Sequence, residues 1–314
     1  MVAFTLAIKL ILMNFIGIFI RKSGTVSSVF SGQLTNMLMK FCIPCLIFYS
    51  IANATEFSFA ELKNCAVVII LGAAAIGLGL LIGQVCYLVN QKSGLGRIMR
   101  YGLTFTHFSF MGIPVMSALF GDIGTFYYSF FLVPVRIFYY ALSEKLMTPA
   151  ETTHSKKSVG HFVKNVLLTP QLIAVFLGLV FWVTGLQLPS VIDYCVKNLN
   201  SISSPLALLL CGIIIGDYDF KKLLHLEYLW LPLLRGLIAP AAFFGIAKLL
   251  LLFGVAEMPC QMFVIFAALP ASSLMPVYAV KYDPNPENHL RAAGSGVISV
   301  LFSALSIPLW FALL

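Results

Sequence analysis

The chain has 314 residues, of which 60% are hydrophobic and only 10% are charged, and its mean hydropathy is +0.96. A soluble domain carries about 25% charged residues, so this composition excludes a water-exposed globular fold and predicts an all-α membrane protein covered by lipid. The net charge of +8 comes from basic residues scattered between apolar runs. No basic face is formed, which excludes a protein that binds nucleic acid.

Ten apolar runs are long enough to cross a membrane, which requires about 20 residues. The predicted spans cover residues 4–20, 33–52, 65–89, 101–120, 124–143, 166–184, 193–215, 228–253, 258–280 and 293–313. Thirteen Lys and Arg residues lie in the odd-numbered loops, two lie in the even-numbered loops and five lie within spans. Because basic residues collect on the cytoplasmic side, this bias predicts a multi-pass protein with both termini outside the cytoplasm.

Landmark residues repeat along the chain with an offset of 161. The pairs in register are Gly17 and Gly178, Gly24 and Gly185, Pro44 and Pro205, Phe59 and Phe220, and Leu62 and Leu223. Since five spans separate the two copies, and five is an odd number, the second copy must be inverted across the membrane. Inverted repeats are the recurring plan of alternating-access transporters. We therefore predict two inverted five-helix repeats, in residues 1–150 and 151–314.

Spans four and nine each contain a proline motif, from His107 to Pro114 and from Ala268 to Pro276. Proline removes a backbone donor and bends a helix, and freed backbone is tolerated in a membrane only where protein or a watery cavity can partner it. Broken helices at corresponding positions of two inverted halves indicate a substrate site near the midplane; a simple proline kink is the alternative. The motif residues predicted to face a substrate are His107, Ser109, Gly112, Pro114, Pro270, Ser272 and Ser273.

The sequence Phe-Met-Gly-Ile-Pro at 110–114, followed by Leu-Phe-Gly at 119–121, resembles the auxin efflux carrier family. That family, within the bile acid/auxin transporter superfamily, includes the plant PIN auxin exporters and bacterial malate and malonate permeases. The stretch 268–282 resembles the corresponding motif of the family's second half. The short central loop, 143–165, is similar to that of the bacterial members, so we expect a plasma membrane protein, as in a bacterial inner membrane.

The resemblance implies ten helices in two repeats, with spans one, two, six and seven as a scaffold and the other six as a moving transport unit. It implies that spans four and nine cross at Pro114 and Pro270, beside the substrate, and that Gln171 faces the substrate as well. His107 and Thr169 stand where the family has Asn, so the identity of the substrate is not carried over. The resemblance is compatible with a homodimer.

Five basic residues fall within predicted spans, where a charge costs about 2.5–3.5 kcal/mol on insertion scales. Arg136 lies deep in span five, and no acidic residue occupies the middle of any span. A guanidinium without a carboxylate partner suits an anionic substrate, which it binds through two hydrogen bonds; satisfaction by freed carbonyls, or reach to the cytoplasmic surface, is the alternative. Lys9, Arg235 and Lys248 are expected to extend from span ends to the membrane surface.

His107 belongs to the one residue type that titrates near physiological pH without perturbation. We hypothesise that it helps couple transport to protons; the alternative is a neutral, hydrogen-bonded histidine. Sodium coupling through backbone carbonyls at the breaks stays open. Cys42 and Cys45 lie within an apolar segment without further ligands, so neither a metal nor another cofactor is predicted.

These features predict a secondary carrier that moves a small organic anion, such as a carboxylate, by an elevator or rocking alternating-access mechanism. The expected partners are this anion, membrane lipid and a coupling proton or sodium ion. A sodium-coupled organic-anion symporter of the bile-acid type is the alternative, followed by an intramembrane enzyme and a channel. The sequence has neither an intramembrane Asp pair nor the His spacing of a zinc site, so an enzyme is not expected.

Overall fold

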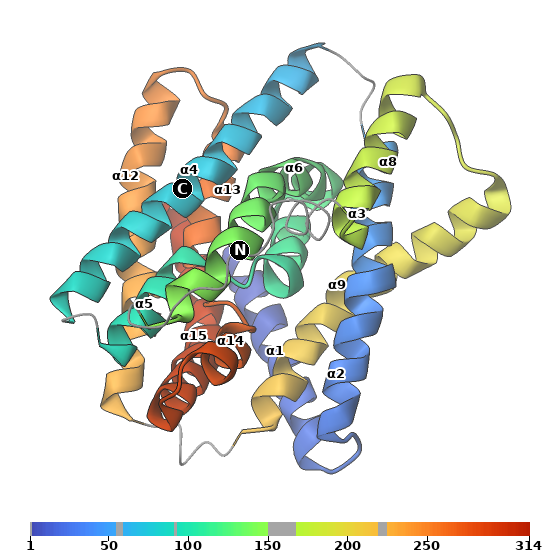
Figure 1. Cartoon of the computed structure of the whole chain (residues 1–314). Helices are drawn as coiled ribbons and strands as arrows, with labels where there is room; N and C mark the ends of the chain where they lie inside the picture. The colour runs from blue at the N-terminus through green and yellow to red at the C-terminus, as the bar shows by residue number, and fades with distance from the viewer. Residues whose placement is uncertain (1, 55–58, 91–92, 150–167, 219–224) are drawn as a thin grey trace.

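The structure is a computed structural model that describes residues 2–54, 59–90, 93–149, 168–218 and 225–314 (Figure 1). The first half contains α1 (Val2–Lys22), α2 (Ser28–Met37), η1 (Leu38–Cys42), α3 (Ile43–Ala52), α4 (Phe59–Val89), α5 (Gly94–Thr104), η2 (Phe108–Gly112) and α6 (Ile113–Met147). The second half contains α8 (Pro170–Thr184), α9 (Ser190–Gly216), η3 (Leu226–Leu229), α11 (Trp230–Leu233), η4 (Leu234–Ile238), α12 (Ala239–Leu252), α13 (Glu257–Ala268), α14 (Met275–Tyr282) and α15 (Pro286–Leu313). The described residues form helices and a single isolated β-bridge, which confirms the all-α prediction.

Six helical stretches are long and apolar enough to cross a membrane by length and composition. They are Val29–Ala52, Glu61–Val89, Phe108–Met147, Ser190–Gly216, Leu226–Leu252 and Pro286–Leu313. Helices α8 and α13 are apolar but shorter. All ten predicted spans contain helix, but the stretch through α6 joins the end of predicted span four to span five. The chain turns there at Gly121, whose φ of 66° and ψ of −152° suit glycine alone. The count of ten therefore stays a prediction.

The helices form two groups that are visible in Figure 1. In one group, α1 packs on α9, α3 packs on α8 and on α9, and α2 contacts α9. In the other, α4 packs on α5, α12 packs on α13, and α15 packs on α14. Helix α6 contacts both groups, because it touches α4 and α5 as well as α3 and α9, and the two groups also meet directly where α1 packs on α15. The predicted boundary between residues 150 and 151 lies outside the described residues.

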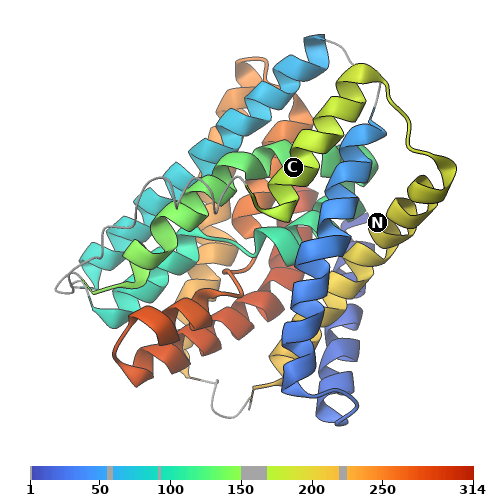
Figure 2. The ribbon, with the colours of Figure 1, turned by 45° about the vertical axis from the view of Figure 1, so that its right-hand side comes forward.

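Two ion pairs join loops that are predicted to lie on the same side of the membrane. Arg21 in α1 pairs with Asp217 at the end of α9, and both chain segments lie at the same end of the molecule in Figure 2. Arg97 in α5 pairs with Asp283, which follows α14, at 2.7 Å from Nη2 to Oδ2. Asp283 also accepts a hydrogen bond of 3.0 Å from Asn288. The cytoplasmic ends predicted for spans four and nine are thus held together.

Candidate functional site

Two helices of the structure are interrupted, and their interruptions meet. Helix α5 ends at Thr104 and η2 begins at Phe108, while α13 ends at Ala268 and α14 begins at Met275. The two extended segments between them pair as a short antiparallel β-bridge. The structure thus contains two broken helices that cross within the protein.

Two backbone hydrogen bonds define the crossing. The His107 amide donates to the Pro270 carbonyl at 2.8 Å, and the Ser272 amide donates to the Phe105 carbonyl at 3.1 Å. In a regular ladder the residue at 270 would donate an N–H to the His107 carbonyl. That carbonyl already accepts from the amides of Met111 and Gly112. Proline, which has no N–H, therefore fits at position 270 without leaving an unpaired acceptor.

The break in the first half lies earlier than the sequence predicted. Helix α6 runs through Pro114 without interruption from η2, and the open segment is at residues 105–107. Proline is tolerated at this position because the wider π-turn η2 precedes it and relieves the clash between the proline ring and the carbonyl four residues earlier. The predicted crossing at Pro114 is therefore wrong in position, whereas Pro270 does lie at the crossing.

A cavity of about 90 Å³ opens beside the crossing. One water needs about 10–15 Å³ of such volume, so the space admits several water-sized groups. Six of the nine residues predicted to bind substrate line it. They are His107, Ser109, Arg136, Gln171, Ser272 and Ser273.

Several polar groups in this cavity are buried and have no hydrogen-bond partner among the described residues. They are Nη1 and Nη2 of Arg136, Oγ1 of Thr106 and Oγ of Ser109. Arg136 is only 3% exposed. Buried polar groups in native proteins are nearly always hydrogen-bonded, and a buried, unpaired guanidinium is especially costly. These unpaired donors all belong to residues that line the cavity.

The rest of the wall is aromatic and amide-bearing. Tyr139, Tyr140 and Tyr278 contribute rings, and Gln171 donates from Nε2 to the carbonyl of Met39 at 2.7 Å. Among the described residues that line the cavity, Arg136 alone has a permanent charge and none is acidic. The cavity therefore combines a fixed positive charge with hydroxyl groups and aromatic surface.

Comparison with known proteins identifies the family of the chain. Residues 2–311 match the family described as membrane transport protein, which is the auxin efflux carrier-like family. The chain belongs to this family. The resemblance found in the proline motifs is thereby confirmed.

Two relatives of this membrane transport protein are similar along their whole length. An uncharacterized transporter from Methanothermobacter thermautotrophicus is 24% identical over 313 residues, which cover 96% of this chain and 95% of that protein. An uncharacterized transporter from Methanocaldococcus jannaschii is 23% identical over 323 residues, covering 99% of this chain and 98% of the relative. The chain is thus a multi-pass membrane transporter by family.

Three residues predicted to bind substrate do not line the cavity of this transporter: Gly112, Pro114 and Pro270. Gly112 is needed for close packing, because an added Cβ would collide with the Tyr128 hydroxyl and lie 3.0 Å from Leu269 Cδ1. Pro270 acts through its backbone in the crossing. Gly112 and Pro270 therefore act on the site through packing and backbone and do not line its wall.

Two further residues of the transporter were misjudged or missed from sequence. Arg235 was expected to reach a membrane surface, but it is 2% exposed and bonds to backbone carbonyls at the crossing. The physical reason is that carbonyls freed by the helix breaks lie closer to the Arg235 guanidinium than the membrane surface does, and they accept its hydrogen bonds. Thr106 was not singled out, because it precedes the proline motif and threonine is an ordinary residue in an apolar helix.

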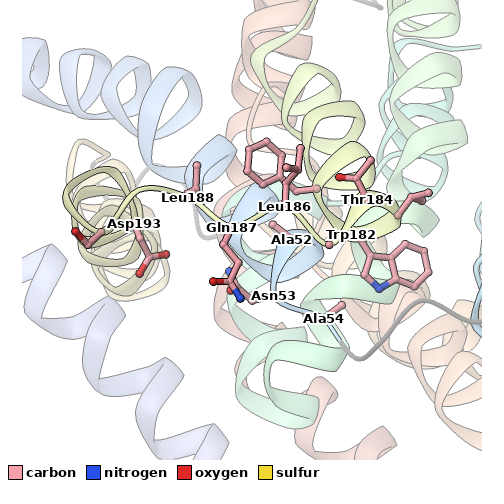
Figure 3. A pocket seen from close by; sticks show the side chains of 13 residues that line it. Ala52, Asn53, Ala54, Trp182, Thr184, Leu186, Gln187, Leu188 and Asp193 are labelled. Carbon is pink, nitrogen blue, oxygen red and sulfur yellow. The ribbon is translucent and has the colours of Figure 1, made fainter.

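Of two further hollows, one adjoins this cavity and the other lies away from it. A smaller one of about 40 Å³ shares His107 and Ser273 with it and is otherwise lined mainly by α9 and α15. His107 Nε2 lies there 3.9 Å from Cys211 Sγ. A wide groove of about 780 Å³ lies at the ends of α3 and α8, where Gln187 and Asp193 line it (Figure 3). None of the predicted site residues lines that groove.

Proposed function

We propose that this membrane transport protein is a secondary carrier for a small organic anion, such as a carboxylate, which binds at the crossing. The observation that carries the proposal is the buried Arg136 guanidinium, whose Nη1 and Nη2 lack partners among the described residues. A planar guanidinium binds a carboxylate through two parallel hydrogen bonds. Thr106 and Ser109 can each donate a further hydrogen bond from their hydroxyls.

The helix ends beside the cavity reinforce the preference for negative charge. Phe108 begins η2 and Leu274 caps α14, and both residues line the cavity. The N-terminal end of a helix carries a partial positive charge. With Arg136 as the one fixed charge in the wall, the local field favours an anion. The tyrosine rings suit the apolar part of such a molecule.

The two packing groups support an alternating-access mechanism. The predicted scaffold spans correspond to α1, α2–α3, α8 and α9, which pack on one another, and the remaining helices carry both breaks. Movement of one group against the other, by rocking or as an elevator, would expose the cavity to each side in turn. We place both termini outside the cytoplasm, in a plasma membrane. A homodimer is compatible with the proposal.

Uptake by the purified protein in liposomes tests the proposal. We expect saturable uptake of labelled malate or another small carboxylate from a panel. Arg136→Gln should raise KM by roughly 30-fold or more, because loss of a buried charge partner costs about 2 kcal/mol or more, and Arg136→Lys should lie between. Lys248→Gln is the matched control, since Lys248 is an exposed cation of α12. If Arg136→Gln leaves the KM of uptake unchanged, Arg136 has no role in the mechanism.

The driving ion is a proton or sodium. For proton coupling we propose His107, which lines both hollows at the crossing. Glutamine does not titrate, so His107→Gln should abolish the stimulation of uptake by a pH gradient while a sodium gradient has no effect. A His107→Gln protein that keeps full dependence on the pH gradient would exclude this role. Stimulation by sodium alone would favour the sodium-coupled alternative, and non-saturating flux would favour a channel.

A further inference from the structure

Arg235 is buried where the two broken helices meet. It belongs to the short π-helix η4, a type of turn that is frequent at functional sites. Its Nε donates to the Leu269 carbonyl at 2.6 Å. Its Nη1 donates to the Leu103 carbonyl at 2.9 Å and also to the Gly102 carbonyl. One guanidinium from a third helix therefore bonds to both broken helices.

The carbonyls that Arg235 binds are those left free by the breaks. Gly102 and Leu103 lie in the last turn of α5, and Leu269 follows the last residue of α13. The last carbonyls of a helix have no helical donor, and they carry about half a negative charge. Two such ends sum to about one negative charge, which the single positive charge of Arg235 balances. Among the described residues, Arg235 forms no ion pair with a carboxylate.

The two buried arginines at the crossing therefore have different surroundings. Arg235 is balanced by two helix C-terminal ends, whereas Arg136 lines the cavity and its Nη1 and Nη2 have no partner in the described part of the chain. If Arg235 were absent, the C-terminal ends would place uncompensated negative charge beside the cavity. They would also lose a side chain that bonds to both ends.

We propose that Arg235 is a positioning residue that joins α5 to α13 at their C-terminal ends, so that the two break segments stay paired and the cavity keeps its positive field. Its effect on transport rests on the proposed function, whereas its effect on the pairing of the breaks does not. Nε and Nη1 point to different helices, so one ammonium cannot replace both contacts. The expected order of function is arginine, then lysine, then glutamine at position 235.

A substrate-independent experiment measures the pairing itself. Thr106 and Ala271 face each other in the β-bridge, at a pair flanked by ladder hydrogen bonds, where Cα atoms lie about 4.5 Å apart and a disulfide can form. In a protein whose seven native cysteines are replaced, Thr106→Cys with Ala271→Cys should oxidise in high yield. Adding Arg235→Gln should lower the yield and rate of oxidation, Arg235→Lys should give intermediate values, and Lys248→Gln should change nothing.

Transport by the variants with the native crossing gives the second readout. For malate, or whichever panel carboxylate the wild type transports, Arg235→Gln should lower turnover roughly tenfold or more, as misplaced groups do. KM should rise less than in Arg136→Gln, because Arg235 does not contact the substrate. If no panel anion is transported by the wild type, the proposed function fails while the disulfide experiment still decides the pairing.

Two results would overturn the role of Arg235. One is an Arg235→Gln protein that matches Lys248→Gln in oxidation yield and turnover. The other is an Arg235→Lys protein at the wild-type level in both, since charge alone would then suffice. If the glutamine variant does not fold, the lysine variant decides by itself, because the proposal requires it to fall below wild type in both measurements.

Discussion

Thr106 and Ser109 place buried hydroxyls in the cavity without a partner among the described residues. Such a hydroxyl destabilises the protein relative to an apolar group of the same shape. We expect Thr106→Val and Ser109→Ala to leave thermal stability unchanged or higher. Each should raise KM for the transported anion by about tenfold, because a hydrogen bond to a charged group contributes about 1.5–3 kcal/mol. Thermal unfolding in detergent and liposome uptake measure the two effects.

The control for these variants is a buried hydroxyl that is already satisfied. Ser129 in α6 donates to the Thr125 carbonyl at 2.7 Å and does not line the cavity. Ser129→Ala should leave KM unchanged. A loss of stability in Ser109→Ala without a change in KM would assign that hydroxyl to the fold instead of to the substrate.

Sequence reasoning at this scale succeeded where a residue was rare for its surroundings. Arg136 stands out because a permanent charge in an apolar run needs a reason, and the structure places it at the cavity. Arg235 is also a permanent charge in an apolar run, but it lies close to the end of its predicted span, which suggested a surface position. Only the fold shows that two helix ends converge on it. Ser109 was identified through the neighbouring proline motif, and Thr106, outside that motif, was not.

At the scale of helical elements, each π-helix is followed by a proline two residues after its end. The three pairs of π-helix end and proline are Cys42 and Pro44, Gly112 and Pro114, and Ile238 and Pro240. A proline inside a helix clashes with the carbonyl four residues earlier and donates no hydrogen bond. A wider turn relieves the clash but leaves carbonyls free. These helices therefore continue through proline instead of breaking at it.

Side chains of other helices bond to those free carbonyls. Gln171 donates to the Met39 carbonyl in η1 at 2.7 Å, and the Tyr128 hydroxyl donates to the Phe108 carbonyl in η2 at 3.2 Å. Unsatisfied backbone is costly in a membrane protein, which accounts for these polar residues. The sequence could identify the prolines, but it could not locate the break at residues 105–107, because no residue type there forbids a helix.

The third π-helix offers a test of this account. The Gly236 carbonyl accepts from Ser306 Oγ at 2.6 Å and from Trp310 Nε1 at 2.8 Å. Ser306→Ala or Trp310→Phe alone leaves one donor in place. The double variant leaves the carbonyl without a side-chain donor and should lose about 1–3 kcal/mol, more than the sum of the single losses. Equilibrium unfolding in detergent measures this, with Ser50→Ala as control, because the buried Ser50 hydroxyl donates to the Leu46 carbonyl of its own helix. If the loss of stability in the double variant equals the sum of the two single losses, this account is contradicted.

The ion pair between α5 and the end of α14 predicts a dependence of stability on pH. Burial raises the pKa of Asp283, but hydrogen bonds from Arg97, from the Asn285 amide and from Asn288 outweigh burial, so this pKa lies below its ordinary value. A carboxyl with a depressed pKa stabilises the fold above its unfolded-state pKa, and this contribution is lost as the pH falls through the folded-state value. The stabilisation by Asp283 should therefore be complete at neutral pH and disappear below about pH 4.

Substitution isolates the contribution of this carboxylate. Asp283 is 2% exposed, so Asp283→Asn should cost on the order of 3 kcal/mol at pH 7, as loss of one partner of a buried pair does. Its cost should shrink as the pH falls. Glu287→Gln removes an ion pair whose carboxylate side chain is 73% exposed and should change stability little. Thermal unfolding from pH 7 to pH 3 distinguishes the two variants. If Asp283→Asn costs the same stability at pH 7 and at pH 3, the predicted dependence of stability on the ionisation of Asp283 is contradicted.

At the scale of the whole molecule, packing follows the offset of 161 that was found in the sequence. Gly17 lets α1 approach α9, and its counterpart Gly178 lets α8 approach α3. If the two halves are equivalent, adding 161 to residue 17 and subtracting 161 from its contacts should give a second set of contacts. Contacts of residue 17 with 209 and 212 then correspond to contacts of residue 178 with 48 and 51. The structure has both sets. The corresponding contacts are Gly17 with Leu209 and Gly212, and Gly178 with Phe48 and Ile51.

This exchange relation is what two inverted halves would give, and it extends to the pairs α4 with α5 and α12 with α13. The sequence supplied the offset, because glycines at close contacts must align. The sequence could not predict which helices these glycines contact, because a repeat shows which residues correspond but not which residues are in contact. The membrane orientation of the two halves stays a prediction.

Alternating access requires the two packing groups to move against each other, so a link between them should stop transport. Ile214 in α9 and Val297 in α15 line the same small hollow from the two groups. In a cysteine-free protein, Ile214→Cys with Val297→Cys, joined by a short thiol cross-linker, should abolish anion exchange, and cleavage of the linker should restore it. Phe48→Cys with Phe181→Cys joins α3 to α8 inside one group, at rings 5.2 Å apart, and should leave exchange intact after linking. The two links have the same chemistry and differ only in whether they join the two packing groups. Equal activity of the two linked proteins would therefore show that the groups do not move against each other during transport.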